Sequence, residues 1–176
     1  ASDLLSQAEH GVDSQAILIT TSEQLAEKVM TEVGTQLDKL PRKEIAEKSI
    51  ANSKIFIVHT IDEAIALSNS YAPEHLIISA NNYRAIAEQI DNAGSIFLGH
   101  YTPESAGDYA SGTNHTLPTN GYAKAYSGVN LDSFRKKITY QEITKEGLEH
   151  IGDAIETMAN NEQLFAHQNA VILRRK

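Results

Sequence analysis

The sequence predicts an α/β protein, in which a parallel sheet lies between layers of helices, followed by a small, mainly helical tail. Four short runs are rich in β-branched residues and apolar almost throughout, which is typical of strands covered on both faces. Helical patterns separate these runs, and strands that alternate with helices form parallel sheets. The alternation stops after residue 98, so we expect three layers only up to that point.

The expected strands are 16–20, 55–58, 76–79 and 95–98. The first helix is expected over 2–10, where Leu4, Leu5 and Ala8 have helical spacing. Further helices are expected at 22–40, 41–53, 62–71 and 83–93. This order suits an incomplete Rossmann-like domain. Because the chain opens inside a helix and without Met, we expect a piece of a longer protein.

Residues 99–128 are dense in Gly, Pro, Ser, Thr and Asn and show no apolar periodicity. A stretch of this length without structure is uncommon inside a domain, so a functional loop or a plain linker could explain it. We favour an active-site loop and assign 1–128 to the α/β domain.

The tail, 129–176, is expected to hold a short polar strand at 137–143 and then two helices, near 145–160 and from 161 onward. Asn160 and Gln163 resemble a capping box that starts the last helix. The apolar stripe of the first tail helix is too small for a core of its own. The tail is therefore expected to dock on the α/β domain or on another subunit.

The composition narrows the class of partner. The formal charge of −8 disfavours nucleic acid and anionic membranes as partners, because both would repel the average surface. The chain has no cysteine, so a metal would need His, carboxylate or amide ligands. No apolar run approaches the roughly 20 residues of a membrane helix, and a cytoplasmic location is expected.

Gln7 and His10 are three residues apart on the first expected helix, so both could reach one metal ion, or they could be a solvated helix end. Glu74 and His75 are adjacent at the edge of the sheet. They could share acid and base work, or be an exposed turn residue and a polar strand edge. Asp108 is expected in the long loop, either as a turn former or aimed into a site.

Glu162 and His167 are five residues apart near the end of the chain, which on one ideal helix is about 140° of rotation. They could flank a ligand but not chelate it side by side. No G-x-G-x-x-G follows a strand, so the sequence contains no standard dinucleotide cradle. From the residues alone we expect an α/β domain with a possible cysteine-free metal site.

Several segments resemble the histidinol dehydrogenase family: DLLSQAEHG, YAPEHLII, DNAGSIFLGHYTPESAGDYASGTNHTLPT and NEQLFAHQNAVILR. The similarity covers essentially the whole chain and is collinear. It implies the carboxy-terminal part of an enzyme that oxidises L-histidinol to L-histidine through an aldehyde, with one zinc ion per subunit and two NAD. It also implies that most NAD contacts come from a region upstream of this chain.

The resemblance further implies residue roles. It matches Gln7, His10, Asp108 and His167 to the zinc ligands of the family, and Glu74 and His75 to its acid and base residues. The implied substrate-binding residues are Gln7, His10, His75, Asp108, Glu162 and His167. It also implies a homodimer in which Glu162 and His167 act across the interface.

Two alternatives stay open at this point. The isolated chain could be a non-catalytic folding or dimerisation module that binds zinc weakly or not at all. The same fold could also serve a hydrolytic metalloenzyme that uses Glu74 and a zinc-bound water.

Overall fold

The computed structural model describes residues 1–176, which form two compact units, Ala1–Phe134 and Arg135–Lys176. The boundary expected after residue 128 falls within the last part of the first unit. No helix in either unit combines the length and the hydropathy that a membrane span requires.

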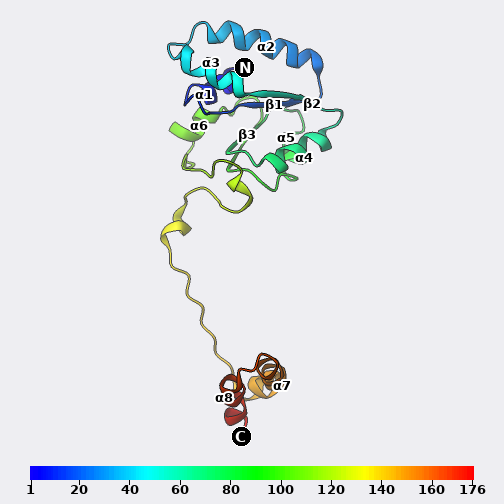
Figure 1. Ribbon diagram of the computed structural model, residues 1–176, viewed down its shortest axis with the longest axis vertical. Coiled ribbons are helices and arrows are strands. Elements are labelled where there is room, and N and C mark those ends of the chain that lie inside the picture. Colours follow the sequence, from blue (N-terminus) through cyan, green and yellow to red (C-terminus); the bar gives the residue numbers. More distant parts are fainter. The chain divides into compact units, whose positions relative to one another are not determined.

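The first unit alternates helices and strands, which confirms the expected α/β class (Figure 1). Its elements are α1 (Ser2–Ala8), β1 (Ile17–Thr20), α2 (Glu23–Leu37), α3 (Lys43–Asn52), β2 (Lys54–Ile57), α4 (Ile61–Tyr71), β3 (His75–Ile78), α5 (Tyr83–Ala87), β4 (Ser95–Leu98), α6 (Glu104–Tyr109) and two 3₁₀ turns, Tyr122–Lys124 and Leu131–Phe134.

The four strands form two separate parallel pairs rather than one continuous sheet. β1 pairs with β2, and Ile17 lies opposite Lys54. β3 pairs with β4, and His75 lies opposite Ser95. In each pair the connection between the two strands contains helix, as parallel strands require.

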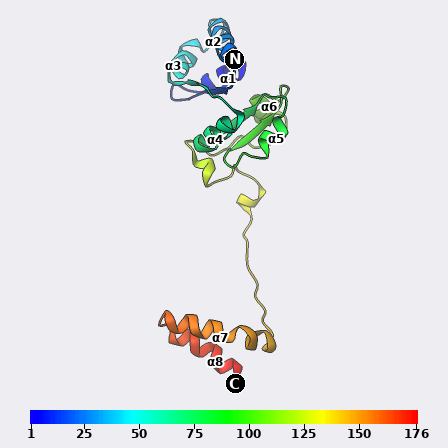
Figure 2. The ribbon, with the colours of Figure 1, turned by 90° about the vertical axis from the view of Figure 1, so that its right-hand side faces the viewer.

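Each strand pair packs against its own helices. α2 and α3 lie on one side of the β1–β2 pair (Figure 1), and α1 contacts both of these helices. The β3–β4 pair packs against α4 and α5, which lie beside it (Figure 2). Its core consists of Ile65, Ile78 and Ile86, one each from α4, β3 and α5. Burying such side chains is the main favourable term for a small domain.

Two helices of the first unit begin at capping residues. The Ser22 hydroxyl accepts a hydrogen bond from the Leu25 N–H, and the Thr60 hydroxyl accepts one from the Glu63 N–H. These bonds satisfy backbone donors that a helix leaves unpaired at its start. They explain why α2 and α4 begin where they do.

The second unit is a pair of helices, α7 (Lys145–Asn161) and α8 (Phe165–Arg175). The strand expected at 137–143 is wrong, because these residues form neither helix nor strand and are exposed. The expected capping box is also wrong. Asn160 is still part of α7, and Gln163 has a φ of 60° in the turn between the helices.

Arg175 joins the two helices. Its guanidinium contacts three carboxylates of α7, those of Glu149 at 3.3 Å, Asp153 at 2.8 Å and Glu156 at 2.6 Å. The Arg175 side chain passes over Gly152, where an added Cβ would lie 2.5 Å from its Cδ. Gly152 therefore allows the close approach of α8 to α7.

Candidate functional site

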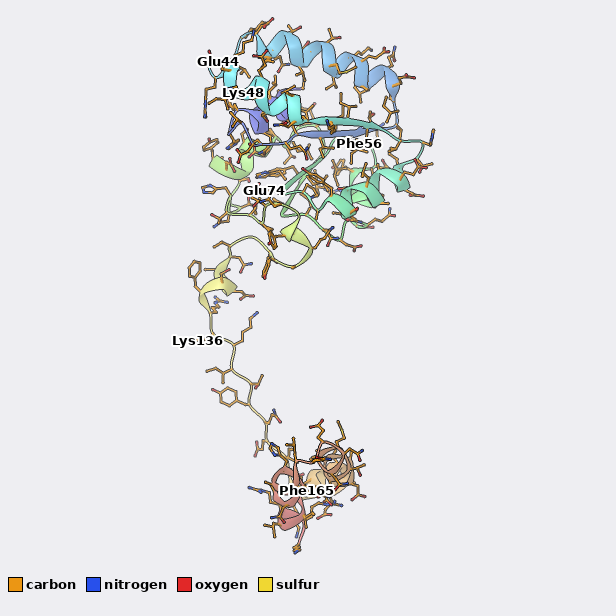
Figure 3. The ribbon with its side chains drawn as sticks, viewed as in Figure 1. Glu44, Lys48, Phe56, Glu74, Lys136 and Phe165 are labelled. Atoms are coloured by element: carbon orange, nitrogen blue, oxygen red, sulfur yellow. The ribbon has the colours of Figure 1, made fainter.

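The amino ends of β3 and β4 carry the first part of the candidate site. Glu74 lies directly before β3, and His75 is its first residue (Figure 3). α4 ends at Ala72, which adopts a left-handed conformation with a φ of 56°. Pro73 follows and cannot continue a helix, so the chain turns into the strand at this point. This turn places Glu74 and His75 at the edge of the β3–β4 pair.

Gly94 holds the starts of the two strands together. Its N–H donates to the Pro73 carbonyl at 2.9 Å, and the Ser95 N–H donates to the Glu74 carbonyl at 2.9 Å. A Cβ on residue 94 would lie 2.5 Å from the Glu74 carbonyl oxygen. Only glycine therefore permits this backbone approach, which positions Glu74 and His75 against β4.

Asp108 lies on helix α6 and not in a loop, so the expectation of an unstructured segment is wrong here. The Thr102 hydroxyl, just before this helix, donates to the Leu98 carbonyl at 2.7 Å. Within α6, Gly107 is buried against Phe97 of β4, and an added Cβ would lie 2.8 Å from the Phe97 ring. Contact with β4, rather than helix propensity, explains this helix.

His10 also differs from its expected place. Helix α1 ends at Ala8, so Gln7 is helical and His10 lies two residues beyond the helix. The His10 N–H donates to the Gln7 carbonyl at 3.4 Å, which keeps the two residues close along the backbone.

Three side chains from two distant parts of the sequence converge beside β3. One ligand atom each of His10, Glu104 and Asp108 lie within 4.8 Å of one another. Glu104 was not singled out from the sequence. Its spacing of four residues from Asp108, together with Pro103 before it, was the available signal.

The same cluster reaches His75. The Oε1 atom of Glu104 lies 3.7 Å from the His75 Nε2, and Ser6 of α1 donates to the Glu104 Oε2 at 3.5 Å. The structure thus brings together three residues expected from the sequence, His10, His75 and Asp108, and one that was not, Glu104.

Burial governs the protonation of the acid and base groups. It raises the pKa of the Glu74 carboxyl, which the charges of His75 and His10 only partly offset. Burial lowers the pKa of the His75 imidazole against the opposing charges of Glu74 and Asp108. Burial, then the charge of Asp108 and a hydrogen bond to it, raise the pKa of Glu104. The neutral His75 can accept a proton, as a general base must.

The donor set fits a cation such as zinc. An imidazole nitrogen from His10 and a carboxylate oxygen from Asp108 are donors that zinc accepts in catalytic sites. Because one chain supplies few ligands here, a metal ion bound at this site would keep coordination positions open for other ligands. Such a site next to a base can bind a small polar molecule and remove a proton from it.

Two expected residues belong to the second unit. Glu162 is the C-cap residue directly after α7. His167 lies in the first part of α8, two residues after Phe165 (Figure 3). Both are exposed. They lie on different elements, so the rotation expected for one continuous helix does not apply to them.

A cavity of about 640 Å³ adjoins the start of β4. It is lined by Gly94 and Ser95, by residues 112–114 and 127–128 of the segment expected to be a loop, and by residues 129–131 of the expected tail. None of the residues that line this cavity is charged.

Comparison with known proteins identifies close relatives. The family model described as histidinol dehydrogenase matches residues 1–175. Histidinol dehydrogenase of Bacteroides thetaiotaomicron is 68% identical over 99% of this chain and 41% of that protein. That of Campylobacter jejuni is 55% identical with the same coverage. The crystal structure of histidinol dehydrogenase from Elizabethkingia anophelis superimposes with a TM-score of 0.91, at 56% identity, over 98% of this chain and 40% of that one.

Proposed function

Because the chain belongs to the histidinol dehydrogenase family, we propose that the complete enzyme oxidises L-histidinol to L-histidine through histidinal, with zinc and two NAD. This reaction is the last step of histidine biosynthesis, and we place it in the cytoplasm. The chain spans 41% of the length of these curated relatives, so the activity is proposed for the complete enzyme. This chain alone is expected to be inactive, and NAD contacts are expected mainly from the length that it does not cover.

The main support for the proposal is that two possible metal ligands, His10 and Asp108, lie near a possible general base, His75. His10 and Asp108 lie in one cluster, and the Glu104 of that cluster is 3.7 Å from the His75 Nε2. A substrate held by a metal ion at His10 and Asp108 would therefore lie close to His75.

We assign zinc to Gln7, His10 and Asp108 of one subunit and His167 of its partner. Zinc supplies a Lewis acid that fixes the imidazole and amine of the substrate. With Asp108 as the single carboxylate among these four residues, the site retains a net positive charge and open positions for substrate.

Proton transfer is assigned to the pair at the start of β3. In the first oxidation, His75 would take the hydroxyl proton while the carbinol carbon gives its hydride to NAD, which forms the aldehyde; His75 then releases that proton to solvent before the second oxidation. Glu74 then takes a proton from the water that adds to the aldehyde. In the second oxidation, His75 takes a proton from the hydrate as its hydride leaves for the second NAD. Partial burial lowers the pKa of the His75 imidazole, and this suits His75 to accept a proton in both oxidations.

A homodimer is proposed to complete the site. Glu162 would bind the imidazole or ammonium group of the substrate across the interface, and His167 would reach the metal. The exposed apolar side chains of the second unit support this arrangement, because a two-helix unit needs a further surface to cover them. They include Ile151, Met158, Leu164, Phe165 and Leu173.

The test measures NADH formation by the complete enzyme. Wild type should form two NADH per histidinol and lose this activity in chelator, and added zinc should restore it. Glu74→Gln should lower the ratio towards one, because water activation serves only the second oxidation. His75→Ala should slow both steps by about 10²-fold or more. Glu88→Gln, an exposed carboxylate at the end of α5, is the control. Turnover of other alcohols but not of histidinol would refute the proposed substrate.

The alternative is that this chain acts only as a folding or dimerisation module, which the exposed apolar side chains of its second unit favour. Calorimetric zinc titration of the chain distinguishes this alternative from the zinc site proposed above. The site proposal requires weaker binding in His10→Ala and in His167→Ala. Equal binding by His167→Ala and wild type would remove His167 from the ligand set. Family membership favours oxidation over the hydrolytic alternative.

A further inference from the structure

Glu104 is the only ionisable residue of the chain whose surface is almost fully buried, with 4% exposed. Its Oε1 atom has no hydrogen-bond partner. A buried carboxyl group with an unpaired oxygen is costly unless the surroundings require it, and such groups gather at functional sites. The role of Glu104 is not covered by the metal, substrate and proton-transfer assignments above.

The surroundings of Glu104 connect the two halves of the candidate site. On the side of the metal-type donors it interacts with Asp108, one turn along α6. On the side of the base its Oε1 faces the His75 Nε2 at 3.7 Å. Its Oε2 accepts from the hydroxyl of Ser6, on the helix that precedes His10. One side chain thus contacts or faces groups on α1, β3 and α6.

Both oxygens of Glu104 face groups of the protein. A metal ligand needs a lone pair directed at the ion, whereas a group that orients ligands needs hydrogen bonds to them. One oxygen of Glu104 also lies within 4.8 Å of donor atoms of His10 and Asp108. Its contacts with Ser6 and Asp108 and its approach to His75 nevertheless fit the second description. Its burial also contrasts with the exposed His10.

We propose that Glu104 is a positioning residue, which holds the Asp108 carboxylate and the His75 imidazole at a fixed separation and ties both to α1. This inference rests on the proposed function, because it assigns Asp108 to the metal and His75 to proton transfer. Its effect comes from the reach and hydrogen bonding of the side chain. Glutamine has the same reach and can both donate and accept hydrogen bonds, while aspartate is one methylene shorter.

The test compares Glu104→Gln, Glu104→Asp and Glu104→Ala in the complete enzyme. Glu104→Gln should keep kcat within about threefold of wild type, whereas Glu104→Asp and Glu104→Ala should lower it by about 10–100-fold, the usual cost of losing a group that orients ligands. KM for histidinol should change little in all three, because none of them removes a substrate contact. A Glu104→Gln enzyme as slow as Glu104→Ala, or an active Glu104→Asp with an inactive Glu104→Gln, would overturn the proposal.

Zinc titration of this chain supplies a readout that does not depend on turnover. Glu104→Gln should bind zinc like wild type, while Asp108→Asn, the ligand control, should bind it more weakly. If Glu104→Gln loses as much affinity as Asp108→Asn, Glu104 is a ligand and the proposal is wrong. If Glu104→Ala lowers only the unfolding midpoint and leaves kcat unchanged, the role is merely structural and the proposal is also wrong.

The two proposals fail in different ways. A wild-type complete enzyme that does not oxidise histidinol refutes the proposed function, whatever the variants do. The zinc affinities of Glu104→Gln and Asp108→Asn would still show which of the two carboxyl groups contributes to zinc binding. If Glu104→Ala fails to fold, Glu104→Gln and Glu104→Asp still show whether the length or the charge of the Glu104 side chain matters.

Discussion

Replacing Gly94 by alanine should separate the starts of β3 and β4 and destabilise the first unit. The new Cβ would lie 2.5 Å from the Glu74 carbonyl oxygen, about 0.9 Å short of the 3.4 Å at which ordinary contact begins. A shift of that size would stretch the bond from the Ser95 N–H to the same oxygen, now 2.9 Å, beyond hydrogen-bonding range. Overpacking costs about 1–3 kcal/mol and a lost hydrogen bond about 1 kcal/mol, so we expect a loss of about 2–4 kcal/mol.

Urea unfolding of the chain, followed by tyrosine fluorescence, measures this loss. Six of the seven tyrosines lie in the first unit, so the signal reports mainly on that unit. Gly34→Ala is the matched control, because Gly34 is an exposed residue of α2 with nothing within 4 Å of its would-be Cβ. That change should stabilise the chain by up to about 1 kcal/mol. If Gly94→Ala unfolds at the wild-type urea concentration while Gly34→Ala shifts as expected, the close approach at Gly94 does not hold the strands together.

Three further substitutions test other parts of the structure. Gly107→Ala would place a Cβ 2.8 Å from the Phe97 ring and push α6 off β4, so the calorimetric zinc affinity of the chain should fall by about tenfold or more; an unchanged affinity would mean that this packing does not position Asp108. Gly152→Ala should displace the Arg175 guanidinium from its carboxylates and lower the helix content measured by circular dichroism in urea. High salt should reduce that difference from wild type, and a difference that salt leaves unchanged would point to packing instead of ion pairs. Thr60→Ala removes the N-cap of α4 and should cost about 1 kcal/mol in urea unfolding, while Thr60→Ser should retain most of the stability; equal losses in both would exclude the cap as the cause.

The strands were the most predictable part of the fold. Each expected run lies within one residue of an observed strand, because β-branched apolar residues in short runs favour extended backbone. The expected cover on both faces is wrong for β2, where Phe56 is 38% and Ile57 53% exposed. The division into two pairs could not be predicted in the same way. Which strands become partners depends on contacts between distant segments, and no local pattern encodes them.

Helix α6 shows why the site was only partly predictable. Residues 104–109 contain a glycine and a serine and no apolar stripe, so local propensity argues against a helix. The contact of Gly107 with Phe97 overrides that propensity. Glu104 was missed for the same reason, since its neighbours become apparent only once α6 packs on β4. Asp108 was expected from the family resemblance rather than from its surroundings.

The tail shows the opposite error. A short polar strand was expected at 137–143, but a strand forms only where its backbone pairs within a sheet, and neither sheet includes these residues. The capping box at Asn160 failed because the chain turns through Gln163 before α8 begins. A sequence motif for a helix start does not say whether the preceding helix has ended.

The direction of β3 matters when the position of an active site is inferred from similarity of fold alone. In open parallel sheets, ligands usually bind beyond the carboxyl ends of the strands. At that end of the β3–β4 pair lie Ser79 and His100, whose Oγ and Nδ1 atoms are 2.7 Å apart, a pairing that would attract attention in a hydrolase. Glu74 and His75 are at the other end. A survey of this fold guided by topology alone would choose that edge and not the one that we propose, so relatives too distant for sequence comparison must be matched on side chains before any active centre is assigned to them.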